Sequence, residues 1–257
     1  MSFRVSLLSV VSLLFLSILA GPLQALDAQD KAGKAPKSGN TVAESRQTRG
    51  LSLPASVQSL AGLSVMLGQA SDSKVTFNLT GNRNQEVRLL YGTDPAKLTL
   101  ASPSVQLVSG SATEIPLAGL SANTEYFYRV QNRSTANGAF VDGPTGRWRT
   151  QAKTGSSFSF AIIGDSHPER SHQFDPDLYI QTLSHIAAAK PDFFLTIGDD
   201  FSVDTLPQVT RPAIEEIYQR QRLYLSLVGS SAPVYLVNGN HEQASLANLD
   251  GSADNVA

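Results

Sequence analysis

The chain has 257 residues, of which 41% are hydrophobic and 16% are charged, so most of it can fold around hydrophobic cores. Its net charge of −2 gives no electrostatic reason to propose nucleic acid as a partner. The chain has no cysteine, which excludes disulfide bonds and thiolate metal sites. Any metal must be held by oxygen and imidazole ligands, which favours Mn, Fe, Zn or Mg.

The first 25 residues have the layout of a secretory signal peptide. Arg4 precedes an apolar stretch over residues 5–20, and Leu23-Gln24-Ala25 is an acceptable small-residue cleavage site. The apolar stretch is shorter than the roughly 20 residues that span a bilayer, so we favour a cleaved signal over a membrane anchor. We therefore expect an exported protein, periplasmic or extracellular, with no stable membrane span after signal cleavage. Residues 26–53 are polar and aperiodic, which is typical of a flexible linker.

Residues 54–151 are expected to form an all-β sandwich. After an apolar lead-in over residues 54–67, short segments that alternate with period two are separated by turn residues; they lie at 74–79, 86–91, 105–108 and 113–117. The segment 120–130 resembles the tyrosine corner of fibronectin type III domains. That resemblance implies that the Tyr126 ring packs in the core and that its hydroxyl bonds to the backbone upstream. Trp148 is expected in the closing strand.

Beyond a polar hinge at 151–157, the pattern changes to strand, helix, strand, helix, strand. Three short hydrophobic runs, at 158–163, 193–197 and 234–237, are bounded by turn residues, which indicates buried strands of a parallel sheet.

Two helices are predicted between these strands. Asp175-Pro176 and Arg211-Pro212 are the expected starts, and Gly229 is expected to cap the second helix. The apolar face of the first helix is expected to contain Leu178, Leu183, Ile186 and Ala187.

Side chains that can bind metal follow each of the three runs. Asp165 and His167 follow the first run, Asp199 follows the second, and Asn240 and His241 follow the third. Open parallel sheets place their chemistry beyond the carboxyl ends of the strands. A pair of ions about 3.5–4 Å apart needs a bridging carboxylate and further ligands. We expect Asp165 and His167 to bind one ion, Asp199 to bridge, and Asn240 to bind the second ion.

The motifs Gly164-Asp165-Ser166-His167, Gly198-Asp199-Asp200 and Gly239-Asn240-His241-Glu242 resemble the first three motifs of calcineurin-like metallophosphoesterases. The sandwich ahead of them resembles the N-terminal domain of purple acid phosphatases. The resemblance implies two divalent or trivalent ions (Fe, Mn or Zn) and attack of a metal-bound hydroxide on a phosphate mono- or diester, small or polymeric. It assigns His241 to leaving-group protonation or transition-state stabilisation.

Two departures from the family pattern change these expectations. Phe201 and Ser202 stand where purple enzymes carry a tyrosine ligand, so the purple chromophore is not expected. The family's C-terminal histidine motifs are not found after His241. We therefore expect residues 156–257 to be the N-terminal, βαβαβ part of an incomplete α/β phosphoesterase domain, weak or inactive in this form. Its last strand is expected to be partly uncovered.

The alternative is a non-catalytic surface or binding protein that uses the fibronectin-like domain and retains a degenerate phosphoesterase remnant.

Four further polar residues, two histidines and two acids, lie near the motifs or in the same domain and are not expected to bind metal. His172 and His185 are expected to have ordinary surface roles. For Asp200 we favour a solvated acid in a loop over a residue that supports a metal ligand. Glu242 is expected to anchor its loop and not to bind metal.

Overall fold

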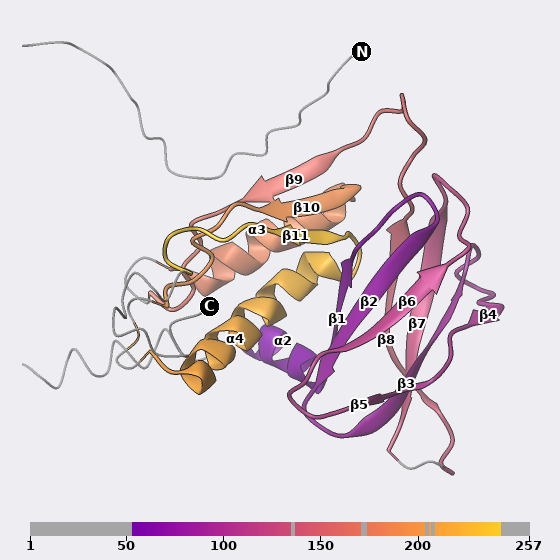
Figure 1. The fold of residues 1–257 in the computed structure, drawn as a ribbon, viewed down its shortest axis with the longest axis horizontal. Coiled ribbons are helices and arrows are strands. Elements are labelled where there is room, and N and C mark those ends of the chain that lie inside the picture. Colours follow the sequence, from indigo (N-terminus) through magenta and orange to yellow (C-terminus); the bar gives the residue numbers. More distant parts are fainter. Residues whose placement is uncertain (1–52, 135–136, 171–173, 204–205, 207–208, 243–257) are drawn as a thin grey trace, which may run out of the picture.

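The computed structural model describes residues 53–134, 137–170, 174–203, 206 and 209–242. The predicted signal peptide, the predicted linker up to residue 52, and His172 lie outside the described residues. In the described part, a β-sandwich stands beside a smaller layer of parallel strands and helices (Figure 1). No helix of that part combines the length and hydropathy needed to span a membrane.

The sandwich consists of two antiparallel sheets in the described residues. One has the order β1-β2-β6, with β1 at Leu63–Gly68, β2 at Lys74–Gly81 and β6 at Thr113–Ala118. The other has the order β4-β3-β7-β8, with β4 at Leu100–Ala101, β3 at Gln85–Gly92, β7 at Glu125–Arg133 and β8 at Val141–Arg149, and β5 at Val105–Leu107 also pairs with β3. A short helical lead-in, α2 at Ala55–Gln58 and η1 at Ser59–Gly62, precedes β1. The sandwich fold is confirmed. Strand β1 lies in the segment that was predicted only as an apolar lead-in, so it is an additional strand.

The tyrosine corner is present in this sandwich. Tyr126 stacks on Trp148, with ring centroids 5.0 Å apart, and its hydroxyl oxygen accepts a hydrogen bond of 2.9 Å from the Ser121 N–H. Phe77 meets Trp148 edge-on at 5.2 Å, so aromatic rings from both sheets fill the centre of the core. The expected roles of Tyr126 and Trp148 are confirmed.

The three hydrophobic runs form a parallel sheet of order β11-β10-β9, with β9 at Phe160–Ile163, β10 at Phe193–Thr196 and β11 at Val234–Leu236. The helix α3, Pro176–Ala189, connects β9 to β10, and α4, Arg211–Gly229, connects β10 to β11. Both helices lie on the same face of the sheet (Figure 1). Because the strands run parallel, their carboxyl ends and the loops that follow meet at one edge.

Helix α3 begins at the predicted residue, but the side chains that it buries differ in part from the predicted apolar face. The Asp175 side chain accepts hydrogen bonds from the N–H groups of Asp177 and Leu178, as an N-cap does. Leu183 is buried as expected, whereas Leu178 is exposed and Tyr179 takes the inward position. The prediction for Leu178 is wrong because the inward face of the helix begins one residue later. His185 is exposed on the same helix, which confirms its surface role.

Helix α4 ends differently from the prediction. Gly229 is buried inside the helix, and the C-cap is Ser230 with an ordinary right-handed φ of −71°. A Cβ at Gly229 would lie 3.0 Å from Val234 and 3.1 Å from Met66. The prediction of a capping glycine is therefore wrong: this glycine lets the helix approach β1 and β11 closely.

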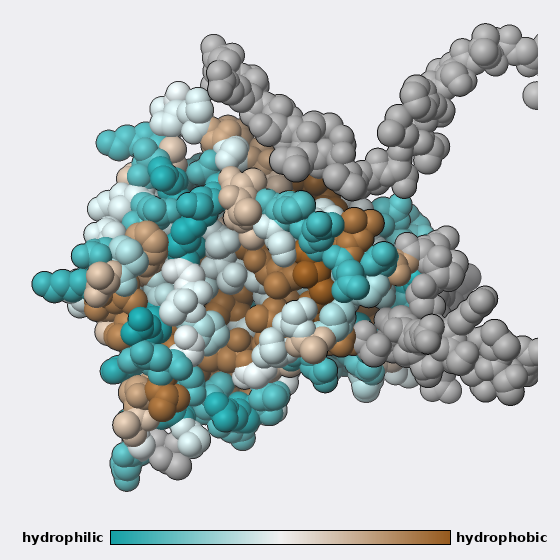
Figure 2. Space-filling model, turned by 180° about the vertical axis from the view of Figure 1, so that it is seen from behind, coloured by the Kyte–Doolittle hydropathy of each residue, from teal (hydrophilic) through white to brown (hydrophobic). Residues whose placement is uncertain are grey.

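The strands of the parallel sheet are buried on one face only, which corrects the prediction of fully buried strands. Ala161 and Ile163 pack towards the helices, whereas Phe160 and Ile162 point outwards. The exposed large hydrophobic residues on and next to these strands are Phe158, Phe160, Ile162, Ile197, Tyr235, Leu236 and Val237. The expected uncovered last strand is confirmed in the exposure of Tyr235 and Leu236. Figure 2 shows hydrophobic residues gathered in the middle of one side of the molecule.

The sandwich is fixed to α4 by hydrogen bonds that cross between the two layers. The Tyr128 hydroxyl donates to the Ser230 carbonyl oxygen over 2.8 Å. Arg222 donates from Nε to Thr80 Oγ1 over 2.9 Å and from Nη2 to the Asn78 carbonyl oxygen over 2.8 Å. The sandwich therefore supports α4, the helix that connects β10 to β11.

Candidate metal centre

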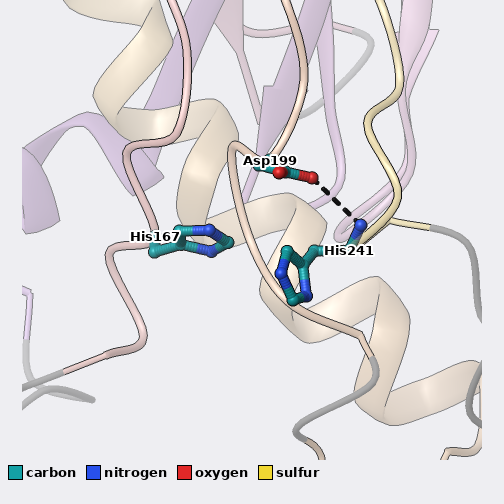
Figure 3. Close-up of side chains that lie close together, drawn as sticks. All are labelled: His167, Asp199 and His241. Atoms are coloured by element: carbon teal, nitrogen blue, oxygen red, sulfur yellow. Dashed lines mark hydrogen bonds between the residues drawn. The ribbon is translucent and has the colours of Figure 1, made fainter. Parts of the chain in front are cut away.

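Three loops meet where the parallel strands end, and backbone hydrogen bonds join them. The Asp165 N–H donates to the Gly198 carbonyl oxygen over 2.9 Å, which ties the first loop to the second. The Val203 N–H donates to the His241 carbonyl oxygen over 2.8 Å, which ties the second loop to the third. The His241 N–H in turn donates to Asp199 Oδ1 over 3.0 Å (Figure 3).

Three candidate ligands have left-handed backbone conformations. The φ angles are 59° at Asp165, 40° at His167 and 53° at Asp199. Residues other than glycine seldom adopt this region, and each such residue costs on the order of 1 kcal/mol or more. Backbone conformations of this kind gather at functional sites, where the surrounding structure holds them in place.

The second and third loops touch at two glycines. A Cβ at Gly198 would overlap the backbone of Gly239, and a Cβ at Gly239 would overlap the Asp199 carboxylate. Gly198 also has a φ of 94°, which side chains rarely permit. Glycine at both positions allows Asp199 to lie against the third loop.

The buried carboxylate of Glu242 holds the second and third loops together. It accepts hydrogen bonds from the N–H groups of Asp199 at 3.0 Å, Asp200 at 2.5 Å and Phe201 at 3.3 Å. It also accepts one from the N–H of Gly239 at 2.6 Å. The prediction that Glu242 anchors its loop is confirmed.

His167 is held at both ring nitrogens. Its Nε2 lies 2.9 Å from Asp165 Oδ1. Its Nδ1 lies 2.9 Å from Ser202 Oγ and 3.3 Å from Glu169 Oε1. Burial opposes ionisation of Glu169, but hydrogen bonds that involve His167 and Ser202 outweigh it and lower the Glu169 pKa. A carboxylate behind a histidine is the usual support for an imidazole that ligates metal through its other nitrogen.

His167, Asp199 and His241 form a group that could hold a metal ion. One ligand atom from each lies within 4.8 Å of the others, and the two imidazole rings meet at nearly a right angle (Figure 3). Two imidazoles and a carboxylate suit Zn, Mn or Fe. Of the five site residues named from the sequence, the structure thus brings three together.

Asp165 and Asn240 lie at the edge of this group. The Asp165 side chain is 80% exposed and touches the group through His167. Asn240 is exposed between Gly239 and His241 in the third loop. Both residues are therefore accessible to solvent at the rim of the group.

Sequence reasoning missed Glu169, Arg170 and Ser202, which support the two histidines. Arg170 Nη2 donates to Ser202 Oγ over 2.7 Å and lies 3.3 Å from each ring nitrogen of His241. The sequence held one signal for Glu169: a carboxylate two residues after a candidate histidine ligand can reach the same ring. Ser202 is 35 residues from His167 and carries no such signal.

Asp200 is buried, so the expectation of a solvated loop acid is wrong. It is 5% exposed, and its Oδ1 is buried without a hydrogen-bond partner among the described residues. Burial, with a further contribution from the nearby Glu242 carboxylate, raises the pKa of Asp200 to about 6. Phe201 is also buried and packs on Tyr218, with ring centroids 4.4 Å apart.

Comparisons with known proteins place these loops in a family. Residues 158–255 match the family described as calcineurin-like phosphoesterase. A search of curated protein sequences found no significant match. Among solved structures, PhoD superposes with a TM-score of 0.53 at 14% identity, covering 74% of this chain and 42% of PhoD. This chain therefore spans less than half of the length of PhoD.

Fibronectin type III domains match at lower scores. The domain from human KIAA0970 has a TM-score of 0.27 at 14% identity, covering 47% of this chain and 88% of that domain. The FN1–FN3 domains of chicken CNTN1 have a TM-score of 0.26 at 20% identity, covering 34% of this chain and 29% of that structure.

The strand-end loops with their histidines and aspartate, together with the family match, define a metallophosphoesterase domain behind an N-terminal β-sandwich. The domain is a calcineurin-like phosphoesterase domain.

We predict that Glu242→Gln destabilises the protein by roughly 2–4 kcal/mol, because the amide presents an NH₂ group to backbone donors that need an acceptor. Thermal unfolding of the purified chain measures this as a melting temperature several degrees lower. Glu215→Gln is the matched control: its side chain is 58% exposed in an i,i+4 pair with Arg211, and we expect almost no change. Equal effects of the two substitutions would contradict the anchoring role.

We predict that Asp200→Asn stabilises the metal-free protein at neutral pH. Because the folded pKa of about 6 lies above the ordinary 3.8, the wild type loses stability as pH rises from about 4 to about 6. The gain from Asn should be absent below pH 4, grow across this window and remain constant above it, on the order of 1–3 kcal/mol. Urea unfolding at several pH values, with a chelator present, measures it. A gain that is independent of pH would contradict the burial of an ionisable carboxyl.

Proposed function

We propose that this protein is an exported, metal-dependent phosphoesterase that hydrolyses phosphate mono- or diesters. The observation that carries the proposal is the convergence of His167, Asp199 and His241 at the carboxyl edge of the parallel sheet. The match of residues 158–255 to calcineurin-like phosphoesterases supports the same reaction class.

In this proposal Asp165, His167, Asp199 and Asn240 hold two ions, drawn from Fe, Mn and Zn. Bound ions of this kind supply Lewis acidity, which lowers the pKa of an attacking water and offsets charge on the phosphoryl oxygens. The contact of His167 with Glu169 and Ser202 keeps its Nε2 directed at Asp165. Asp199 is oriented by the His241 N–H, so its second oxygen stays available.

His241 is proposed to face the ester. Its ring can donate a proton to the leaving oxygen or stabilise charge as that bond breaks. Arg170 lies against this ring and against Ser202, and we propose that it positions the imidazole. Its guanidinium also brings positive charge to the place where an anionic substrate would bind.

Export is proposed from the order of charged, apolar and small residues over positions 1–25. A phosphoesterase in the periplasm or outside the cell would act on esters that reach that compartment.

We predict that Asp199→Ala removes metal-dependent hydrolysis. The full chain is assayed with Mn²⁺ or Zn²⁺ and a chromogenic phosphate ester, and Mn²⁺ binding is followed separately by calorimetry. Metal affinity should fall by roughly a hundredfold or more, and the weak turnover expected of this chain should be lost, because a carboxylate at the centre of the candidate ligand group is removed. Asp177→Ala, an exposed aspartate in the first turn of α3, is the control and should keep both properties. Undiminished turnover in Asp199→Ala would overturn the proposed mechanism.

We predict that the protein expressed from its full sequence in a bacterial host is cleaved after Ala25 and recovered from the periplasm or the medium. N-terminal sequencing of the recovered protein gives the first residue, which should be Leu26. A mature protein that still begins at residue 1 and remains with the membrane would contradict the cleaved signal.

A further inference from the structure

A cavity of about 380 Å³ lies between α4 and the edge of the β-sandwich. Its polar lining comes from the end of β2 and the following turn, from Ser109 and Gly110, and from α4. Two arginines of α4, Arg220 and Arg222, face it, and Leu53 and Leu223 provide apolar wall. A volume of this size is at the lower end of the range for small-molecule sites.

Arg222 brings a buried positive charge to this cavity. Its hydrogen bonds go to neutral acceptors: Thr80 Oγ1, the Asn78 carbonyl oxygen and Met66 Sδ. No carboxylate forms an ion pair with it in the part of the chain that the structure describes. Burial lowers its pKa to about 10, which still leaves the guanidinium charged at neutral pH.

Arg220 adds a second charge that is only partly neutralised. Its side chain is 13% exposed, and Nη2 lies 3.1 Å from Glu216 Oε1. Glu216 itself is 72% exposed, so water screens much of its charge. The Nη1 atom of Arg220 is buried and has no hydrogen-bond partner among the described residues. A buried donor without an acceptor is costly, so the Arg220 guanidinium is not fully satisfied by Glu216.

We propose that this cavity binds a phosphate group, carried either as inorganic phosphate or as a small phosphate monoester. Arginine recognises tetrahedral oxyanions because its guanidinium presents several N–H donors in a fixed plane, and two arginines line this cavity. The side chains of Asn82 and Ser109 add neutral donors, and the leucines can contact an organic group. The lining contains no residue of the three loops, so phosphate binding here does not depend on the proposed hydrolysis.

The test is titration calorimetry of the full chain in the presence of a chelator, so that phosphate cannot bind through metal. Inorganic phosphate and glycerol 2-phosphate are titrated separately, and the tighter of the two identifies the source of the phosphate group. We expect saturable binding by the wild type. Arg220→Gln should weaken it by about tenfold, because one charged hydrogen bond is lost.

Two further variants make the result specific. Glu216→Gln should tighten binding about threefold, because it removes the anion that competes for Arg220. Arg211→Gln is the matched control, an exposed arginine in an i,i+4 pair on the same helix, and should bind as the wild type does. Absence of saturable binding by the wild type, or equal affinity in Arg220→Gln, overturns the proposal. If Arg220→Gln does not fold, Glu216→Gln decides: unchanged or weaker binding also overturns it.

Discussion

The carboxylate of Glu242 is the interaction on which the candidate site depends. It accepts hydrogen bonds from backbone N–H groups of two different loops, and it is buried, so no water can replace it cheaply. Asp199 is therefore fixed by its own backbone before any ion binds. A ligand that is already in place loses less conformational freedom on binding a metal than one on an open loop. Glu242, which is not a proposed metal ligand, therefore fixes the position of Asp199, which is one.

Helix α4 links this site to the β-sandwich. On one side Gln221 donates to Ser166 Oγ in the first loop over 3.1 Å. On the other side Arg222 and the end of the helix bond to β2 and β7. The sandwich thus helps to support the candidate metal centre, because removing it would expose a buried arginine and the close packing at Gly229. Arg220 and Arg222 stand on either side of Gln221, so the phosphate cavity and the first loop share one helix.

Much of the fold and part of the site could be predicted from the sequence, for physical reasons that differ between elements. The parallel strands were evident because each hydrophobic run ends at a glycine, and the Tyr126 corner was evident because its spacing is local. Strand β1 was missed because its four central residues are all buried and show no alternation. Asp200 was misjudged because its buried surroundings include Glu242, which is 42 residues further along the chain. Arg170 and Ser202 were missed because their contacts join residues more than 30 positions apart.

The left-handed backbone at Asp165, His167 and Asp199 has a consequence for stability. Glycine at these positions would relax the backbone, so replacing the candidate ligands would remove local strain. Each substitution that removed a candidate ligand in this way would lower the backbone strain at that position.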